Sequence, residues 1–387
     1  MDKNLGYYLC DGKEFTSKIQ ACLHAEKVNK PLSWIFNNHI FEKNDWKTEP
    51  VESLDALYDQ RARELREKYD YLILSYSGGA DSHNILMSFI RQNLLIDEII
   101  VNTMDKGNSK YTIVNQNIRD PRHAASEHYL QTVPRLKEVE NLIPRTKISI
   151  FDLTDNLFDS FTKAGDASWI LDKREGLNPL GATRFNYIHF SEIRKKFDKD
   201  KKIALVLGIE KPRTFIHSNG SFYIRFTDRA TNLVTVAEHI QDYTNSTVEY
   251  FYWSPDSCRL LTKQAHIIKR WLEAFPDKQH LWIGKTLTAE KYRLVHERLL
   301  RNILYTTWDD NWYQADKATK DWYSEFDAWF IDGHVGTNAH TIWLDGVRYL
   351  EENAKSFVKA GDDGIKDGLI VYSHNYEIGP MRNLCQE

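Results

Sequence analysis

The stretch "YLILSYSGGADSHNILMSFI", residues 71–90, joins an apolar run to a cluster of small and polar residues. Residues 71–77 are too apolar to alternate, which is typical of a strand that is buried on both faces of a parallel sheet. Residues 81–93 have the amphipathic spacing of a helix. Ligands of open α/β sheets bind at the carboxyl ends of the strands, so the turn between these two elements is the first candidate for a site.

Three more apolar runs resemble the first: residues 97–103, 146–153 and 202–209, each rich in Ile, Val or Leu. Amphipathic stretches such as 122–140 and 154–164 separate them. Alternation of strands and helices predicts a parallel sheet with right-handed crossovers. The sequence therefore predicts an α/β fold with a doubly wound sheet.

The chain divides into three predicted parts. Residues 1–68 form a helical N-terminal segment, because apolar residues recur there at helical spacing between charged ones. Residues 69–226 form the α/β domain. Residues 227–387 form a mainly helical C-terminal region for substrate specificity, with long helical patterns at 256–275 and 288–305. A last short strand is expected at 369–373.

Composition excludes several classes of protein. The 387 residues are 42% hydrophobic and 27% charged, with a formal net charge of −4, so we expect a globular chain without a global basic field. The four cysteines are scattered and form no C-x-x-C pair, which favours reduced thiols. No window approaches 18 uninterrupted apolar residues and no signal peptide is evident. We expect a cytoplasmic protein without a membrane partner.

The turn after the first strand has the chemistry of a phosphate site. Consecutive glycines let the backbone approach a ligand and adopt positive φ, while serine hydroxyls add donors to the free amides of the helix start. The carboxylate of Asp81 suits a helix cap or a Mg²⁺ ion that bridges to phosphates. An ordinary capped turn without a ligand is the alternative. The candidate residues are Ser75, Ser77, Gly78, Gly79, Asp81 and Ser82.

Better-known phosphate and nucleophile motifs are absent from the sequence. There is no G-x-x-x-x-G-K-[ST] and no G-x-G-x-x-G. The nucleophile elbow G-x-S-x-G is excluded because position 75 is Ser where that motif needs Gly.

The stretch "SYSGGADS" (75–82) resembles the S-G-G-x-D-S signature of the PP-loop ATP pyrophosphatases, which include asparagine and GMP synthetases, tRNA thiolation enzymes and relatives of ATP sulfurylase. The resemblance is specific over 71–90 and extends plausibly over the α/β domain. It implies the adenine nucleotide alpha hydrolase-like fold, Mg²⁺ and ATP as cofactors, and cleavage of ATP between the α- and β-phosphates. By resemblance, the pyrophosphate is held by Ser77, Gly78, Gly79 and Ser82, Asp81 acts through Mg²⁺, and adenine meets the backbone near Asn102 and Thr103.

A second cluster, "LVLGIEKPRT" (205–214), ends the fourth predicted strand. In the functional interpretation, Gly208 permits close backbone approach, and Lys211 and Arg213 are expected to neutralise charge on the α-phosphate and the departing pyrophosphate. The run is similar to the Gly-then-basic loop of sulfurylase-like and reductase-like family members. A turn with surface-exposed basic residues is the alternative.

The predicted function is an ATP-dependent ligase that adenylates an acceptor, with a small-molecule acceptor favoured. Two absent features disfavour some reactions of this family. Residue 2 is Asp where a glutaminase domain carries its catalytic cysteine, and no cysteine pair suited to sulfur transfer is present. The expected partners are a protein that supplies ammonia or further copies of this chain in a homo-oligomer. Two alternatives stay open: an adenylase that modifies tRNA or a nucleobase, with RNA as its partner, and a non-catalytic module that binds or sequesters a nucleotide.

Overall fold

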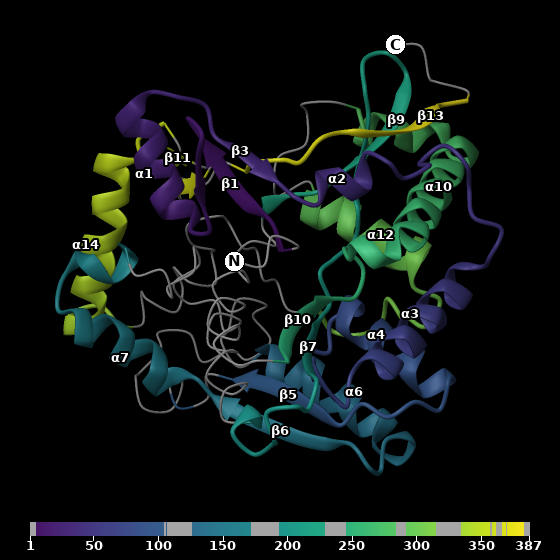
Figure 1. The fold of residues 1–387 in the computed structure, drawn as a ribbon, viewed down its shortest axis with the longest axis horizontal. Coiled ribbons are helices and arrows are strands. Elements are labelled where there is room, and N and C mark those ends of the chain that lie inside the picture. Colours follow the sequence, from purple (N-terminus) through teal and green to yellow (C-terminus); the bar gives the residue numbers. More distant parts are fainter. Residues whose placement is uncertain are drawn as a thin grey trace.

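A five-stranded parallel sheet forms the centre of the α/β part of the computed structural model (Figure 1). The sheet order is β10-β7-β4-β5-β6, and every neighbouring pair is parallel. Its strands are β4 (Tyr71–Ser75), β5 (Glu98–Thr103), β6 (Lys147–Asp152), β7 (Ile203–Leu207) and β10 (Ser246–Tyr250). The structure describes residues 5–103, 106, 126–171, 193–228, 245–283, 292–314, 334–356, 358–360, 366–368 and 370–382.

The four strands predicted from sequence are confirmed. All five residues of β7 are buried, as are Leu72, Ile73 and Leu74 of β4, which is the burial expected of central parallel strands. β6 lies at an edge of the sheet, and its Ile148 and Ile150 are exposed. The sequence therefore identified the strands correctly, and burial differs between centre and edge.

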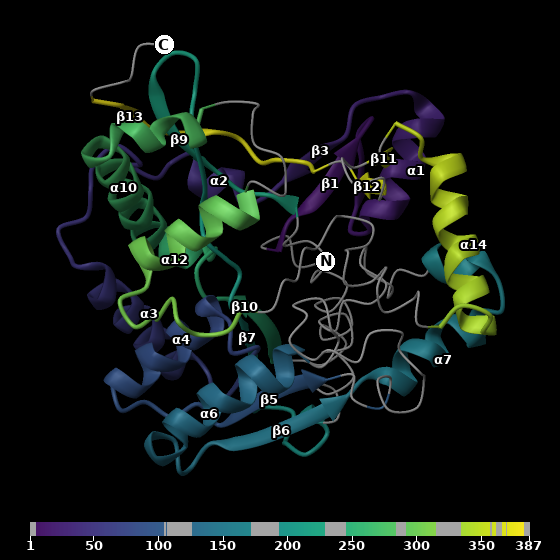
Figure 2. The ribbon, with the colours of Figure 1, turned by 180° about the vertical axis from the view of Figure 1, so that it is seen from behind.

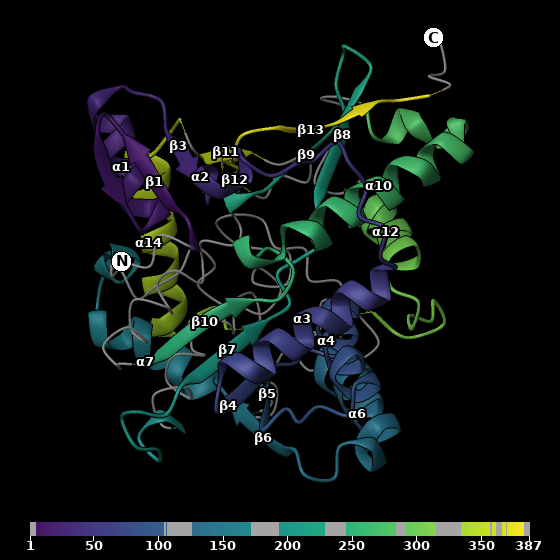
Figure 3. The ribbon, with the colours of Figure 1, turned by 45° about the vertical axis from the view of Figure 1, so that its right-hand side comes forward.

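Helices follow the strands as the alternation predicted. α4 (Ala80–Arg91) follows β4, and α6 (Val133–Val139) with the preceding π-helical turn η2 (Glu127–Thr132) lies between β5 and β6. α3 (Leu54–Lys68) packs against α4, and the two lie on the same side of the sheet as α6 (Figure 3). α7 (Thr154–Ala164) leaves β6 and packs against α14 (Asn338–Asn353), as seen from behind in Figure 2.

The order of the strands reverses between β4 and β7. The chain starts the sheet at β4, adds β5 and β6 on one side, and then returns to add β7 and β10 on the other. Crossovers on the two sides of such a point diverge, which leaves the loops after β4 and β7 side by side at the carboxyl edge. Both glycine-containing candidate stretches of the sequence are thus brought to one place.

The N-terminal segment is not wholly helical, contrary to expectation. Its predicted helices are present as α1 (Lys18–Val28) and α3, but a three-stranded antiparallel sheet of order β2-β1-β3 accompanies them. A tight turn at Asp11 and Gly12, with φ of 49° and 76°, joins the first two strands. Asp-Gly suits this turn because both positions need positive φ. The remaining elements are β1 (Tyr7–Cys10), β2 (Lys13–Phe15), β3 (Ser33–Ile35) and α2 (Asn38–Phe41).

The C-terminal region contains more strand than the sequence predicted. β10 and β13 lie beyond residue 226. β10 completes the parallel sheet, and β13 pairs with β9 in an antiparallel sheet of order β13-β9-β8, whose other two strands precede residue 226. The strand expected at 369–373 is only a bridge between Thr227 and Tyr372. The helix predicted at 256–275 is confirmed as α10. Residues 292–304 of the helix predicted at 288–305 are helical and end in α12, while residues 288–291 lie outside the described ranges. The bounds are β8 (Arg213–Ile216), β9 (Ser221–Arg225), β13 (Tyr376–Pro380), α10 (Cys258–Ala274), α12 (Arg298–Leu304), β11 (Val358–Ala360), β12 (Lys366–Gly368), η3 (Glu140–Leu142), η4 (Ala167–Leu171), η7 (Pro255–Ser257), η8 (Pro276–Leu281) and η10 (Tyr292–Glu297).

Aromatic packing and a buried ion pair join the N-terminal segment to the rest of the chain. Phe41 of α2 stacks on Phe226, just after β9, at 4.7 Å between ring centroids. Lys18 of α1 pairs with Asp228 at 2.7 Å, and both side chains are almost fully buried. Among the described residues, no helix has the length and apolar character needed to cross a bilayer.

Candidate functional site

The loop after β4 adopts a conformation that requires glycine. Gly78 has a φ of +67°, and a Cβ atom there would lie 2.8 Å from the Cα of Thr132. Gly79 has ordinary backbone angles and is the residue immediately before α4. Positive φ and close contact with η2 therefore both favour glycine at residue 78.

The carbonyl groups of this loop are bound by side chains of η2 and α6. The Ser77 carbonyl accepts hydrogen bonds from Gln131 Nε2 at 2.8 Å and Thr132 Oγ1 at 2.7 Å, and Arg135 donates to the Gly78 carbonyl. A trans peptide directs its N–H opposite to its C=O, so the amides of Gly78 and Gly79 point away from these donors. Together they begin a row of N–H groups that continues into α4.

Part of this row has no acceptor. The Gly79 amide donates to Ser77 Oγ at 3.2 Å. No hydrogen bond from the amides of Gly78, Ala80 or Asp81 is found within the described ranges. Amides at the start of a helix carry partial positive charge and have no partner within the helix. The loop and the first turn of α4 thus offer donors to an anion.

The loop serines brace the turn. Ser82 Oγ donates to the Gly79 carbonyl at 3.2 Å and accepts from the Ser77 amide at 3.3 Å. The Ser77 and Ser82 hydroxyls lie 3.4 Å apart. Ser75, the last residue of β4, is half-buried. The two loop hydroxyls hold the turn together and lie at its centre.

Asp81 is the meeting point of three segments of the chain. Lys211 Nζ lies 2.6 and 2.9 Å from its two carboxylate oxygens. The Tyr305 hydroxyl donates to Asp81 Oδ1, and the Tyr252 hydroxyl donates to the Asp81 backbone carbonyl at 2.9 Å. Burial, together with the charge of Asp81, raises the pKa of Tyr305, so this hydroxyl remains a donor. Lys211 is only 4% exposed, whereas the Asp81 side chain is 26% exposed.

Gly208 lets the loop after β7 approach α4. A Cβ atom on Gly208 would lie 3.2 Å from the Ser82 amide nitrogen and 3.3 Å from Asp81 Cβ. This closeness carries Lys211 to the first turn of α4. Arg213, by contrast, begins β8 and pairs with Glu210 at 2.5 Å. The structure thus brings Lys211 to the loop, while the described ion pair of Arg213 is with Glu210.

Asn102 and Thr103 end β5, next to the loop. The pairing of β4 with β5 stops at Ser75 and Ile100, and the Tyr76 amide then donates to the Ile100 carbonyl at 2.9 Å. Asn102 and Thr103 therefore extend past β4 at the carboxyl edge. The Thr103 hydroxyl is buried and has no hydrogen-bond partner among the described residues.

Sequence reasoning missed Arg135, which is 2% exposed. Its guanidinium packs against the rings of Trp308 and Trp312, 4.7 and 4.8 Å from their centroids, and donates to the Tyr313 carbonyl at 2.9 Å. Burial lowers the pKa of Arg135 to about 10, so the side chain remains charged at neutral pH. A buried cation next to the loop adds to the positive potential there. No motif in the sequence indicates that Arg135 lies at this loop.

His83 also lies next to the loop after β4, among the aromatic side chains that contact Arg135. Its ring packs edge-on against Trp312 at 5.1 Å, and its Nδ1 lies 2.9 Å from the Tyr76 hydroxyl. Burial and the charge of Arg135 lower the pKa of His83 to about 4, so the imidazole is neutral at physiological pH.

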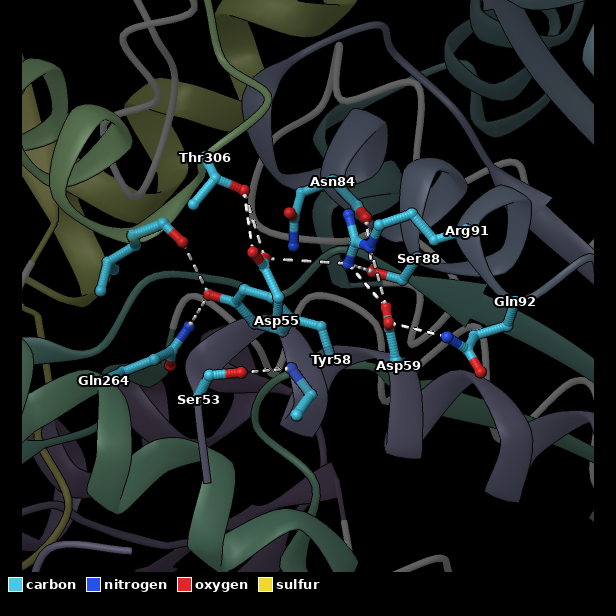
Figure 4. Close-up of polar contacts among 12 residues, drawn as sticks. Ser53, Asp55, Tyr58, Asp59, Asn84, Ser88, Arg91, Gln92, Gln264 and Thr306 are labelled. Atoms are coloured by element: carbon cyan, nitrogen blue, oxygen red, sulfur yellow. Dashed lines mark hydrogen bonds and ion pairs between the residues drawn. The ribbon is translucent and has the colours of Figure 1, made fainter. Parts of the chain in front are cut away.

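Hydrogen bonds between helices fix the segment that carries Tyr305 (Figure 4). Tyr58 of α3 donates to the Leu304 carbonyl at 3.2 Å and accepts from Gln264 Nε2 at 3.0 Å. Asp59 of α3 binds Arg91 at the end of α4, at 2.7 Å. α3 therefore connects α4 to α10 and α12, and through them sets the position of Tyr305 relative to Asp81.

A surface pocket between α2 and β13 is a poor fit for a polyphosphate. Its lining includes Glu42, Asp45 and Glu377, and its lysine, Lys47, is paired with Glu377 at 2.8 Å. Carboxylates repel phosphate, so this pocket does not compete with the loop after β4 as a nucleotide site.

Comparison and metal searches identify no further feature. Neither the scan against protein-family models nor the search of curated proteins returned a match to this chain. Within the ranges that the structure describes, no group of three or more His, Cys, Asp or Glu side chains is placed to hold a metal ion.

Proposed function

We propose that the chain is an ATP pyrophosphatase-type enzyme with the adenine nucleotide alpha hydrolase-like fold, which adenylates an acceptor for C–N ligation. The observation that carries the proposal is the position of Lys211. Its ammonium group contacts the Asp81 carboxylate, next to loop and helix amides that have no acceptor among the described residues. Cation, carboxylate and N–H donors converge where the strand order reverses. This is the place at which nucleotides bind to such sheets.

The residues present fit a nucleotide that carries Mg²⁺. The amides and Lys211 match phosphate oxygens, and the partly exposed carboxylate of Asp81 matches a hard cation. Mg²⁺ commonly takes one or two carboxylates and completes its shell with phosphate oxygens and water. The single carboxylate of Asp81, next to the row of N–H groups, is consistent with this coordination. When bound, Mg²⁺ would neutralise part of the charge on the phosphates.

The chain's own groups would act on the α- and β-phosphates. The amides of the loop orient the pyrophosphate, and Lys211 stabilises charge that develops on the bridging oxygen. A carboxylate or carbonyl oxygen of the acceptor attacks the α-phosphorus, the bond from that phosphorus to the bridging oxygen breaks, and pyrophosphate leaves. An amine or ammonia then displaces AMP and forms the C–N bond. Asp81 neutralises Lys211 until the nucleotide arrives.

Product analysis with labelled ATP tests the proposal. The protein is incubated with Mg²⁺ and α-labelled ATP, with pooled metabolites or small RNAs as acceptors. We expect AMP and pyrophosphate, and a loss of about 10²- to 10³-fold for Lys211→Met, the usual effect of removing a group that stabilises transition-state charge. Lys201→Met is the matched control, because Lys201 is an exposed lysine next to the opposite end of β7. Formation of ADP and phosphate in the wild type would contradict the proposal.

A non-catalytic nucleotide-binding module is the second candidate. It is favoured by the engagement of Asp81, which the Tyr305 hydroxyl and Lys211 both contact. Tight nucleotide binding without turnover in any acceptor pool would support this candidate over the enzyme.

A further inference from the structure

One face of the β8–β9 hairpin joins two arginines to aromatic side chains. Arg213 lies opposite Arg225 in the register of the hairpin, and Phe215 lies opposite Tyr223. The rings of Phe215 and Tyr223 stack at 5.6 Å between centroids. Because side chains alternate along a strand, these four residues share one face, and the intervening Ile216, Phe222 and Ile224 are buried on the other.

Arg225 packs against two aromatic rings. Its guanidinium carbon lies 3.6 Å from the ring centroid of Tyr372 and 4.5 Å from that of Phe215. Its Nε is buried without a hydrogen-bond partner, and in the described part of the chain no carboxylate pairs with it. Burial lowers the pKa of Arg225, and the charge of Arg213 acts in the same direction.

Keeping Arg225 in this setting has an electrostatic cost. Burial of a cation is unfavourable unless it is paired, and a second cation on the neighbouring strand adds repulsion. Glu210 offsets the charge of Arg213, and no carboxylate of the described residues offsets that of Arg225. The two rings contact the planar group, and aromatic rings supply no anionic partner for its N–H donors. Those donors form the fork with which arginine binds phosphate through two parallel hydrogen bonds.

The hairpin begins at the candidate nucleotide site. β8 starts two residues after Lys211, and two residues span at most about 7 Å. The chain passes directly from the carboxyl end of β7 into β8, so the antiparallel sheet lies beyond that edge (Figure 3). An acceptor seated next to Lys211 can therefore extend along this face.

We propose that Arg225, assisted by Arg213, binds a phosphate group of the acceptor, which makes the acceptor a nucleotide. The inference rests on the proposed function, because it names the second substrate of the same reaction. Aromatic rings near the arginine suit a flat base: Tyr372 is 38% exposed, and the exposed His217 lies beside Tyr223 at 5.6 Å between ring centroids. The phosphate belongs either to a free mononucleotide or to a single-stranded polynucleotide.

Binding measurements separate these sources. Uridine monophosphate and a short single-stranded oligouridylate are titrated into the full chain by calorimetry, in the presence of an ATP analogue that cannot be cleaved between its α- and β-phosphates. Arg225→Gln is expected to weaken binding of the probe by about tenfold or more, as loss of a charged hydrogen bond does. Arg298→Gln, which removes an exposed arginine of α12, is expected to leave binding unchanged. Circular dichroism verifies folding.

Arg225→Lys covers the case in which the glutamine variant fails to fold. Lysine keeps the charge and the contact with the rings but lacks the fork, so we expect a smaller loss of probe affinity. Binding of both probes identifies a mononucleotide acceptor, and binding of the oligouridylate alone identifies a polynucleotide. The inference is overturned if neither probe binds the wild type, or if folded Arg225 variants bind as the wild type does. Affinity for the ATP analogue, followed separately, reports on the proposed function itself.

Discussion

Two adjacent glycines of the loop after β4 should differ sharply in their tolerance of alanine. In Gly78→Ala the new Cβ would sit in a left-handed backbone conformation and 2.8 Å from the Cα of Thr132. The conformation costs about 1–2 kcal/mol, and the backbone contact costs about 1–3 kcal/mol because η2 must shift. Reduced entropy of the unfolded chain returns about 0.4–1 kcal/mol. We expect a net loss of about 2–4 kcal/mol in the free energy of unfolding.

Gly79→Ala is the matched control for this substitution. Its φ is −70°, and its Cβ would lie 3.2 Å from Ser77 Oγ, an atom that can rotate away. Alanine is a poorer N-cap by a few tenths to about 1 kcal/mol, and the entropy of the unfolded chain offsets most of this. We expect a change within about 1 kcal/mol. Urea denaturation of the three proteins measures both values. Equal destabilisation by the two substitutions would refute the loop geometry described above.

Other predictions concern Arg135 and His83, which lie next to the loop after β4. Arg135→Gln removes the donors to the Gly78 and Tyr313 carbonyls. We expect the free energy of unfolding, measured by urea denaturation, to fall by about 2–4 kcal/mol, and ATP to bind more weakly. The control Arg145→Gln, at an exposed arginine, should change neither quantity. The pKa of His83 is about 4 in the folded protein and 6.5 in the unfolded chain. The stability that the neutral imidazole contributes is therefore fully present above pH 6.5, and up to about 3 kcal/mol of it is lost as the pH falls towards 4. His83→Gln should flatten the stability profile between pH 6.5 and 4.5; an unchanged slope would show that His83 titrates normally.

The strands and the loop were predictable because their signals are local. Residues 71–82 contain a strand, a glycine turn and a helix start in continuous sequence. Lys211 was also predictable, since strand alternation puts the ends of neighbouring parallel strands at one edge. Arg213 illustrates the limit of this reasoning: β8 begins at this residue, and the described ion pair of Arg213 is with Glu210.

The missed residues depend on contacts between distant parts of the chain. Tyr305 reaches Asp81 across 224 positions, and Arg135 reaches Gly78 across 57. No local pattern shows which aromatic or basic side chain will close over the loop. The N-terminal hairpin is different, because Asp11-Gly12 between alternating residues is a turn signal that was overlooked.

The central claim is that the chain breaks ATP between the α- and β-phosphates at the loop after β4. Exchange of labelled pyrophosphate into ATP, in the presence of Mg²⁺ and pooled acceptors, tests it most directly because only reversible cleavage at that bond transfers the label. We predict label in ATP with the wild type and with Lys201→Met, a rate about 10²- to 10³-fold lower with Lys211→Met, and no label with Asp81→Asn. Absence of exchange in the wild type together with release of ADP, or exchange that persists in Asp81→Asn, would contradict the claim.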